Sequence, residues 1–278
     1  MSYEFLPGRL YRMPTHFGPA TGPRSGPDGK KFHCKSDPRC AAYAVSFLTD
    51  AKLLDAMLPP GFSLVGEPVV TVALTVMTEL EWLAGRGYNV LGVTFPAAYQ
   101  GASGRTVGSF LSVLWESMAD PIITGREELG YSKVFAELPE PLVLNGKITC
   151  TASWMGYRFM EMTLEPTQQL TAEQITAAGA AAAKIDGTLH YRYIPRVGAP
   201  GQADAQYAVL TPSAVPNRVT SSISRGTGSV KFLPARWEDM PTQYMIVNAF
   251  ASLPQLEQRG ASVTHSIGFK DLSDQRIL

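Results

Sequence analysis

The pattern of apolar and polar residues predicts a chain built mainly from strands. Runs rich in Val, Ile, Thr, Tyr and Phe, most of them bounded by Gly, Pro or Asn, have the composition of half-buried strands. They cover approximately residues 68–77, 88–95, 107–115, 147–154, 157–164, 188–194, 206–210, 218–223 and 229–233. Only Met155 and Gly156 separate two of these runs, which predicts a hairpin with a two-residue turn.

Three segments have helical patterns instead. Asp50 can cap a short helix with an apolar stripe over 53–58, which the prolines at 59 and 60 end. Thr171 and Gln174 fit a capping box ahead of an alanine-rich run that ends near 186. A last helix is expected from about 241 to 258, with a break near Pro254.

The first forty residues are the least regular part of the chain, because prolines and glycines recur between Pro14 and Pro38. We therefore expect an N-terminal arm or loop over 1–40, with a disordered tail as the alternative, and a single domain over 41–278. Many strands with few helices predict an α+β fold. Its mainly antiparallel sheet would be curled or closed, as a barrel or cone, around a central pocket.

Composition narrows the classes of partner. Lys plus Arg and Asp plus Glu both number 24, so the formal net charge is zero, which disfavours nucleic acid and anionic membranes as partners. A hydrophobic share of 45% with 17% charged residues predicts a substantial core. The longest apolar stretches, about ten residues, are too short to cross a bilayer. Three cysteines with no CxxC pair, and no secretory segment after Met1, favour a reduced and cytoplasmic location.

Metal and nucleotide sites find no support in the sequence. The four histidines show neither HxH nor HExxH spacing, and His33, Cys34 and Cys40 lack a fourth ligand at a typical interval. The chain also lacks a phosphate-binding Gly-Lys-Ser/Thr ending and a Gly-x-Ser-x-Gly elbow. We therefore expect neither a metal nor a cofactor.

The segment 120–136 is the best candidate for chemistry. Lys133 lies between Tyr131 and three apolar residues, where partial burial would disfavour its ammonium and leave an amine able to attack a carbonyl. An exposed surface lysine is the commoner alternative for this residue type. Glu116 ends a mostly apolar run through Trp115, so it is a candidate proton shuttle, with a strand-end surface carboxylate as the alternative. Tyr88, Tyr99 and Tyr131 are candidates to orient a substrate carbonyl or to donate a proton, with packing around a satisfied hydroxyl as the alternative.

The stretch from Gly125 to Lys133, GREELGYSK, resembles the G-R-E-x-x-x-Y/F-P-K-K signature of the acetoacetate decarboxylase family. Further resemblances follow in the same order along the chain, from about residue 40 to 250: Thr49-Asp50, Leu53–Pro59, Glu67-Pro68, Met155–Arg158, Tyr191–Pro195 and Asp239–Pro241.

This resemblance implies a mechanism. In that family one lysine forms a Schiff base with a keto substrate, and the iminium accepts the electrons released when carbon dioxide leaves. The matching residue here is Lys133, and Tyr131 matches the aromatic residue before it. Arg126 and Glu127 match an R-E pair that either holds the lysine loop as an ion pair or acts directly. The family also implies a homo-oligomer.

The chain departs from the family at several matched positions. Val134 stands where the decarboxylase has a second lysine, and Ala73 and Val90 stand where it has pocket glutamates. Arg39 lies near the family's pocket arginine but out of register. Because of these departures, we expect a substrate other than acetoacetate itself, from among the other keto acids.

We therefore predict a Schiff-base-forming lyase acting on a small keto acid, with decarboxylation placed first. The alternatives are aldolase, dehydratase or retro-aldol chemistry on a 2-oxo acid through the same lysine, or a non-catalytic small-molecule binding protein. The predicted catalytic residues are Lys133, Glu116 and Tyr131, and the predicted substrate-binding residues are Tyr88, Arg126 and Trp115.

Overall fold

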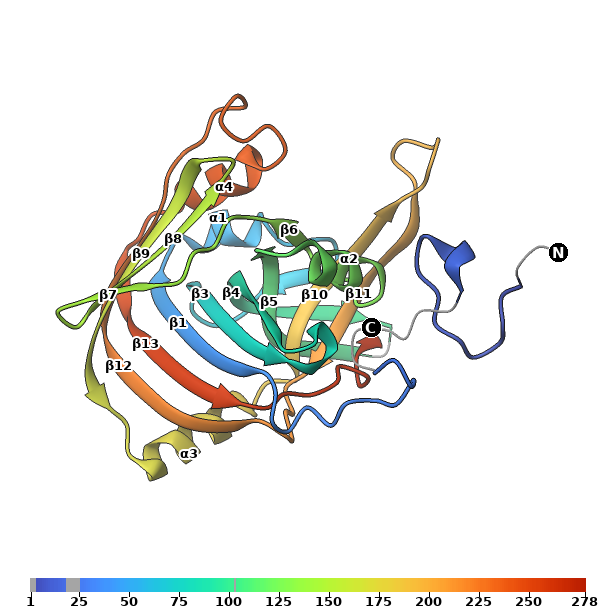
Figure 1. Ribbon diagram of the computed structural model, residues 1–278. Helices are drawn as coiled ribbons and strands as arrows, with labels where there is room; N and C mark the ends of the chain where they lie inside the picture. Colours follow the sequence, from blue (N-terminus) through green and yellow to red (C-terminus); the bar gives the residue numbers. More distant parts are fainter. Residues whose placement is uncertain (1–3, 19–25, 103) are drawn as a thin grey trace.

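The computed structural model describes residues 4–18, 26–102 and 104–278, and in these parts of the chain fourteen strands form one mixed sheet (Figure 1). The strands are β1 (Arg39–Leu48), β2 (Phe62–Leu64), β3 (Val69–Leu80), β4 (Arg86–Gly101), β5 (Gly104–Glu116), β6 (Lys133–Phe135), β7 (Leu142–Leu144), β8 (Lys147–Trp154), β9 (Tyr157–Gln169), β10 (Gly187–Pro195), β11 (Ala203–Pro212), β12 (Val219–Phe232), β13 (Glu257–Ile267) and β14 (Arg276–Ile277). The helices are α1 (Ala51–Asp55), α2 (Ala119–Glu127), α3 (Ala172–Ala182) and α4 (Tyr244–Ala251), with 3-10 turns η1 (Thr15–Phe17) and η2 (Glu81–Leu83).

The strands follow the order β14-β11-β10-β5-β4-β3-β1-β13-β12-β9-β8-β7, with β2 on β4 and β6 on β5. Neighbours are antiparallel except for β5 with β10 and β5 with β6, so the predicted mainly antiparallel α+β fold is observed. The sheet curves strongly (Figure 1). No strand pairing joins β14 to β7 in the described residues, and only an isolated bridge, Glu137 with Ser153, links the segment after β6 to β8. Closure into a barrel or cone therefore stays a prediction.

The two faces of the curved sheet differ in side-chain size. Along β3, Val70, Val72 and Leu74 are fully buried, because alternate residues of a strand point to one face. That face packs with Trp115 and other aromatic residues into the main core. The opposite face carries small side chains such as Ala42 and Thr75, which leave open space above the sheet.

Local predictions are confirmed where the chain carries strong local signals. The Asp50 carboxylate caps α1, and Thr171 and Gln174 form a capping box at α3. The hairpin β8–β9 turns at Met155 (φ 48°) and Gly156 (φ 83°), both in the left-handed region that such two-residue turns require.

Other elements differ from the prediction. The runs 218–223 and 229–233 belong to one continuous strand, β12, since its alternation continues through the glycines between them. The expected last helix is confined to α4, and the end of the predicted helical range already belongs to β13. β1 was not predicted, and it begins at the boundary expected between arm and domain. The prediction also lacked α2, β2, β6, β7, β13 and β14.

The described part of the N-terminal arm reaches the body through Arg12. Its guanidinium donates to Thr124 Oγ1 at 2.6 Å and pairs with Glu128 Oε1 at 3.0 Å, both at the end of α2. Residues 1–3 and 19–25 of the predicted arm lie outside the described residues. Within the described residues, no helix has the length and apolarity needed to span a membrane.

Candidate active site

Lys133 is buried, with a 7% exposed residue surface, at the start of β6. β6 pairs in parallel with β5, and Leu114 is the register partner of Lys133. The Lys133 ammonium nitrogen Nζ lies 2.8 Å from Glu116 Oε1 and donates to the Pro121 carbonyl at 3.1 Å. The sheet thus holds an amine and a carboxylate in direct contact away from bulk water.

Glu116 is the more deeply buried partner, with 1% of its surface exposed. Burial raises the pKa of this carboxyl, and the charge of Lys133 and its hydrogen bond oppose the rise. The second oxygen, Oε2, has no hydrogen-bond partner in the described part of the protein. Glu116 therefore has one oxygen on the lysine and one available for a proton or a ligand.

α2 fixes the side chain of Lys133 by close backbone approach. A Cβ built on Gly125 would lie 2.3 Å from Lys133 Cδ and 2.6 Å from Nζ, so only glycine leaves room for this lysine conformation. Arg126 donates from Nη1 to the Lys133 carbonyl at 2.9 Å. Among the ion pairs of the described residues there is none between Arg126 and Glu127, and Arg126 holds the loop through this main-chain contact.

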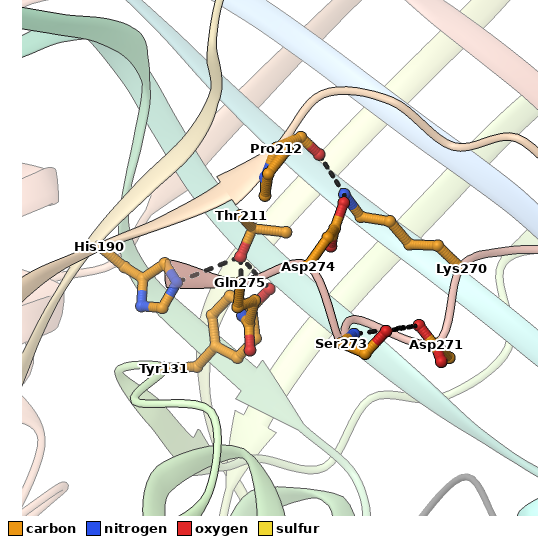
Figure 2. Close-up of polar contacts among 9 residues, drawn as sticks. All are labelled: Tyr131, His190, Thr211, Pro212, Lys270, Asp271, Ser273, Asp274 and Gln275. Carbon is orange, nitrogen blue, oxygen red and sulfur yellow. Dashed lines mark hydrogen bonds and ion pairs between the residues drawn. The ribbon is translucent and has the colours of Figure 1, made fainter. Parts of the chain in front are cut away.

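A hydrogen-bonded network fixes Tyr131 (Figure 2). The His190 ring is fully buried, which lowers its pKa to about 4 and keeps it neutral near pH 7. Its Nδ1 lies 3.0 Å from the Gly130 carbonyl, which only accepts, so Nδ1 carries the proton and Nε2 accepts from Thr211 Oγ1 at 3.2 Å. Thr211 Oγ1 then accepts from the Tyr131 hydroxyl at 2.8 Å and from Gln275 Nε2 at 2.7 Å.

These donor directions point the Tyr131 hydroxyl proton at Thr211. The ring also stacks on His190, with centroids 4.3 Å apart, and its centroid lies 5.5 Å from Lys133 Nζ. Tyr131 is therefore a rigid wall beside the lysine rather than a group with a proton directed at a substrate.

Two cavities meet at the lysine. The small chamber, about 120 Å³, is lined among others by Asp37, Pro121 and Lys270. The large chamber, about 510 Å³ and mostly apolar, is lined among others by Val90 and Glu116. Both chambers share six lining residues: Met77, Tyr88, Tyr131, Lys133, Phe269 and Leu272.

The chain matches one known protein family over most of its length. The family model for acetoacetate decarboxylase matches residues 12–258. This chain belongs to the acetoacetate decarboxylase family. A search of curated protein sequences gives no match.

Solved structures of the acetoacetate decarboxylase fold resemble the chain over most of its length. Acetoacetate decarboxylase from Legionella pneumophila is 18% identical with a TM-score of 0.65, covering 92% of this chain and 93% of that one. The enduracididine biosynthesis enzyme MppR, complexed with the condensation product of pyruvate and imidazole 4-carboxaldehyde, is 17% identical (TM-score 0.64; 97% of each chain). An acetoacetate decarboxylase-like enzyme from Sphingomonas wittichii RW1 is 18% identical (TM-score 0.59; 87% and 91%).

In this member of the acetoacetate decarboxylase family, four of the six predicted site residues lie together around the chambers. Lys133, Tyr131 and Tyr88 line both chambers, and Glu116 lines the large one. Arg126 contacts the main-chain carbonyl of Lys133 and lines neither chamber.

Trp115 is not at the site, so its predicted substrate contact is wrong. Its side chain is fully buried on the face opposite Glu116, because consecutive strand residues point to opposite faces. There it packs on Phe159, with ring centroids 5.1 Å apart, and its Nε1 donates to Gln243 Oε1 at 2.7 Å.

The structure shows where two of the positions at which the chain departs from the family lie relative to the chambers. Val90 on β4 is the direct register partner of Glu116 on β5, so their side chains lie side by side on one face. The Glu116 carboxylate therefore lies beside the position that the family resemblance matches to a pocket glutamate. Arg39 is an exposed partner of Glu79 at 2.6 Å and lines neither chamber.

Several residues of the site were missed at the sequence level. Asp37 lies in the predicted arm, Lys270 lies in the segment between β13 and β14, and His190 and Thr211 occupy ordinary strand positions. These four residues are distant from Lys133 in the sequence, and the fold brings them close to its site. Within the described residues no group of three or more His, Cys, Asp or Glu side chains is arranged to hold a metal ion.

Proposed function

We propose that the protein is a Schiff-base lyase acting on a small keto acid, with Lys133 as the nucleophile and Glu116 as the acid–base group. The observation that carries this proposal is the 2.8 Å contact between two buried groups, Lys133 Nζ and Glu116 Oε1. A carboxyl with a raised pKa can take the ammonium proton over that distance and leave a neutral amine.

The steps follow from these two groups. The neutral amine of Lys133 adds to the substrate carbonyl carbon to give a carbinolamine. The proton held on Glu116 converts the carbinolamine hydroxyl into water, which leaves a protonated imine. The bond to the carboxylate then breaks, its electron pair moves into the imine to form an enamine, and carbon dioxide departs. Glu116, protonated again from solvent, returns a proton to the enamine carbon, and water releases the product ketone.

Decarboxylation is placed first because the chain belongs to the acetoacetate decarboxylase family. Aldol or retro-aldol chemistry on a 2-oxo acid is the second candidate, since the same enamine can attack, or be released from, an aldehyde carbon. It is favoured by the structural likeness to MppR, whose complex holds a condensation product of pyruvate with an aldehyde. The volume of the large chamber, about 510 Å³, also suits a second fragment better than carbon dioxide alone.

Borohydride trapping tests the proposal. Reduction in the presence of a keto acid should fix one adduct on Lys133, located by peptide mass spectrometry, and Lys133→Met should abolish it. Lys147→Met, at an exposed lysine, is the matched control and should retain the adduct. Carbon dioxide release without aldehyde indicates decarboxylation, and aldehyde release or uptake indicates aldol chemistry. Ligand binding without any adduct on Lys133 would refute the Schiff base and leave a binding protein.

A further inference from the structure

Two charged side chains in the small chamber take no part in the steps above. Asp37 precedes β1, and Lys270 follows β13 in a segment beyond the part that the family model matches. Their exposed fractions are 4% and 6%. Charged groups are rarely buried to this degree unless another group pairs with them, so the partners of both side chains must be identified.

Lys270 has a hydrogen-bond donor to spare. Its ammonium donates to the Pro212 carbonyl and pairs with Asp274 Oδ2 at 3.1 Å (Figure 2). An ammonium has three donors, and two are accounted for by these contacts. The third remains for an acceptor in the chamber that Lys270 lines together with Lys133.

Asp37 has an acceptor to spare. Its Oδ2 accepts from the Glu81 amide at 3.2 Å, but its buried Oδ1 has no hydrogen-bond partner in the described residues. Leaving such an oxygen buried and unpaired destabilises the folded protein. A ligand that donates a hydrogen bond to Oδ1 would recover this cost.

We propose that the small chamber is a substrate subsite in which Lys270 binds a carboxylate and Asp37 Oδ1 accepts a hydrogen bond from a hydroxyl group of the same short-chain oxo acid. The proposal rests on the proposed function, because Lys133 in the same chamber must bind the oxo carbon. The carboxylate is one that the reaction retains, since an ammonium paired with a departing carboxylate would stabilise it against loss as carbon dioxide. The ligand class is therefore a hydroxylated oxo acid that keeps an acid group in its product.

Matched probes isolate the contact with Lys270. Trapping at Lys133 is titrated with 2-oxobutanoate and with its uncharged methyl ester. A charge-assisted hydrogen bond should make the acid half-saturate at a concentration about 10- to 100-fold lower than the ester. Lys270→Met should reduce that ratio to near one. Lys31→Met is the control, because Lys31 pairs at 3.5 Å with Asp271 of the same segment but lines neither chamber, and it should keep the ratio.

A second variant separates binding from a purely structural role. Asp274→Asn removes the counter-ion of Lys270 and leaves the ammonium in place. If Lys270 binds the substrate, this variant should favour the acid over the ester more strongly than the wild type does. If Lys270 only fastens the C-terminal segment, the ratio stays unchanged in both variants while thermal stability falls, and the proposal is overturned.

The hydroxyl contact has its own test. 4-Hydroxy-2-oxobutanoate should half-saturate trapping at a concentration about 3- to 10-fold lower than 2-oxobutanoate, and Asp37→Asn should shrink that difference. Equal trapping of both acids by the wild type would overturn the assignment of Asp37. Complete absence of adducts with every probe would instead refute the Schiff base itself, so the two failures are distinguishable.

Discussion

Gly125→Ala gives the sharpest test of how the lysine is held. The new Cβ would lie 2.3 Å from Lys133 Cδ, whereas ordinary contact begins at 3.4 Å, so the side chain must move by about 3.4 − 2.3 = 1.1 Å. The contact between Lys133 Nζ and Glu116 Oε1, now 2.8 Å, then opens to about 4 Å, beyond hydrogen-bond range. A misplacement of about 1 Å at a reacting group costs roughly 100-fold in rate.

The same substitution should leave the fold largely intact. Losing the charge-assisted hydrogen bond costs about 1.5–3 kcal/mol, while replacing a helical glycine by alanine returns up to about 1 kcal/mol. The free energy of unfolding should therefore fall by about 0.5–3 kcal/mol, measured by urea denaturation. Gly179→Ala in α3, where a Cβ meets nothing within 4 Å, calibrates the helix gain alone. If Gly125→Ala is trapped by borohydride as fast as the wild type, the proposed packing of α2 on Lys133 is refuted.

Three further predictions follow from contacts described above. Arg126→Met removes the 2.9 Å bond to the Lys133 carbonyl, and trapping should slow about tenfold without loss of the fold by circular dichroism. Trp115→Phe leaves the buried Gln243 Oε1 without its donor, so the free energy of unfolding in urea should fall by about 1–3 kcal/mol. Trapping at Lys133 should be unchanged, and slower trapping would show that Trp115 contributes to the site. The pKa of His190 falls from 6.5 to about 4 on folding, so its stabilising contribution is present above pH 6.5 and is lost as pH falls toward 4. The loss is about 3 kcal/mol, and His190→Asn should flatten that part of the pH–stability curve.

Much of the fold was predictable because several elements carry local instructions. Thr171 with Gln174 specifies the start of α3, and Met155-Gly156 specifies the hairpin between β8 and β9. α2 carries no such instruction, because its N-cap residue makes no side-chain hydrogen bond and Gly125 lowers its helix propensity. The helix forms because it packs on β5 and β6, which a local pattern does not reveal.

The candidate site was predictable as far as its motif extends. Lys133 and Glu116 were identified from an apolar setting and a family signature, but Trp115 could have been excluded by strand alternation, since it directly precedes Glu116. Asp37 and Lys270 carry no motif. Their proximity to the nucleophile is a property of the chain path, with the segment after β13 returning across β11.

The pairing of Val90 with Glu116 bears on how relatives of this protein are recognised. Under the proposed function, the acid–base carboxylate of Glu116 lies on the strand next to the one where the resemblance places a glutamate, so it has a similar position in space but a different column in a sequence alignment. Surveys that score aligned columns would discard such a protein as inactive. A structural comparison that treats register partners on neighbouring strands as equivalent positions would retain such a protein.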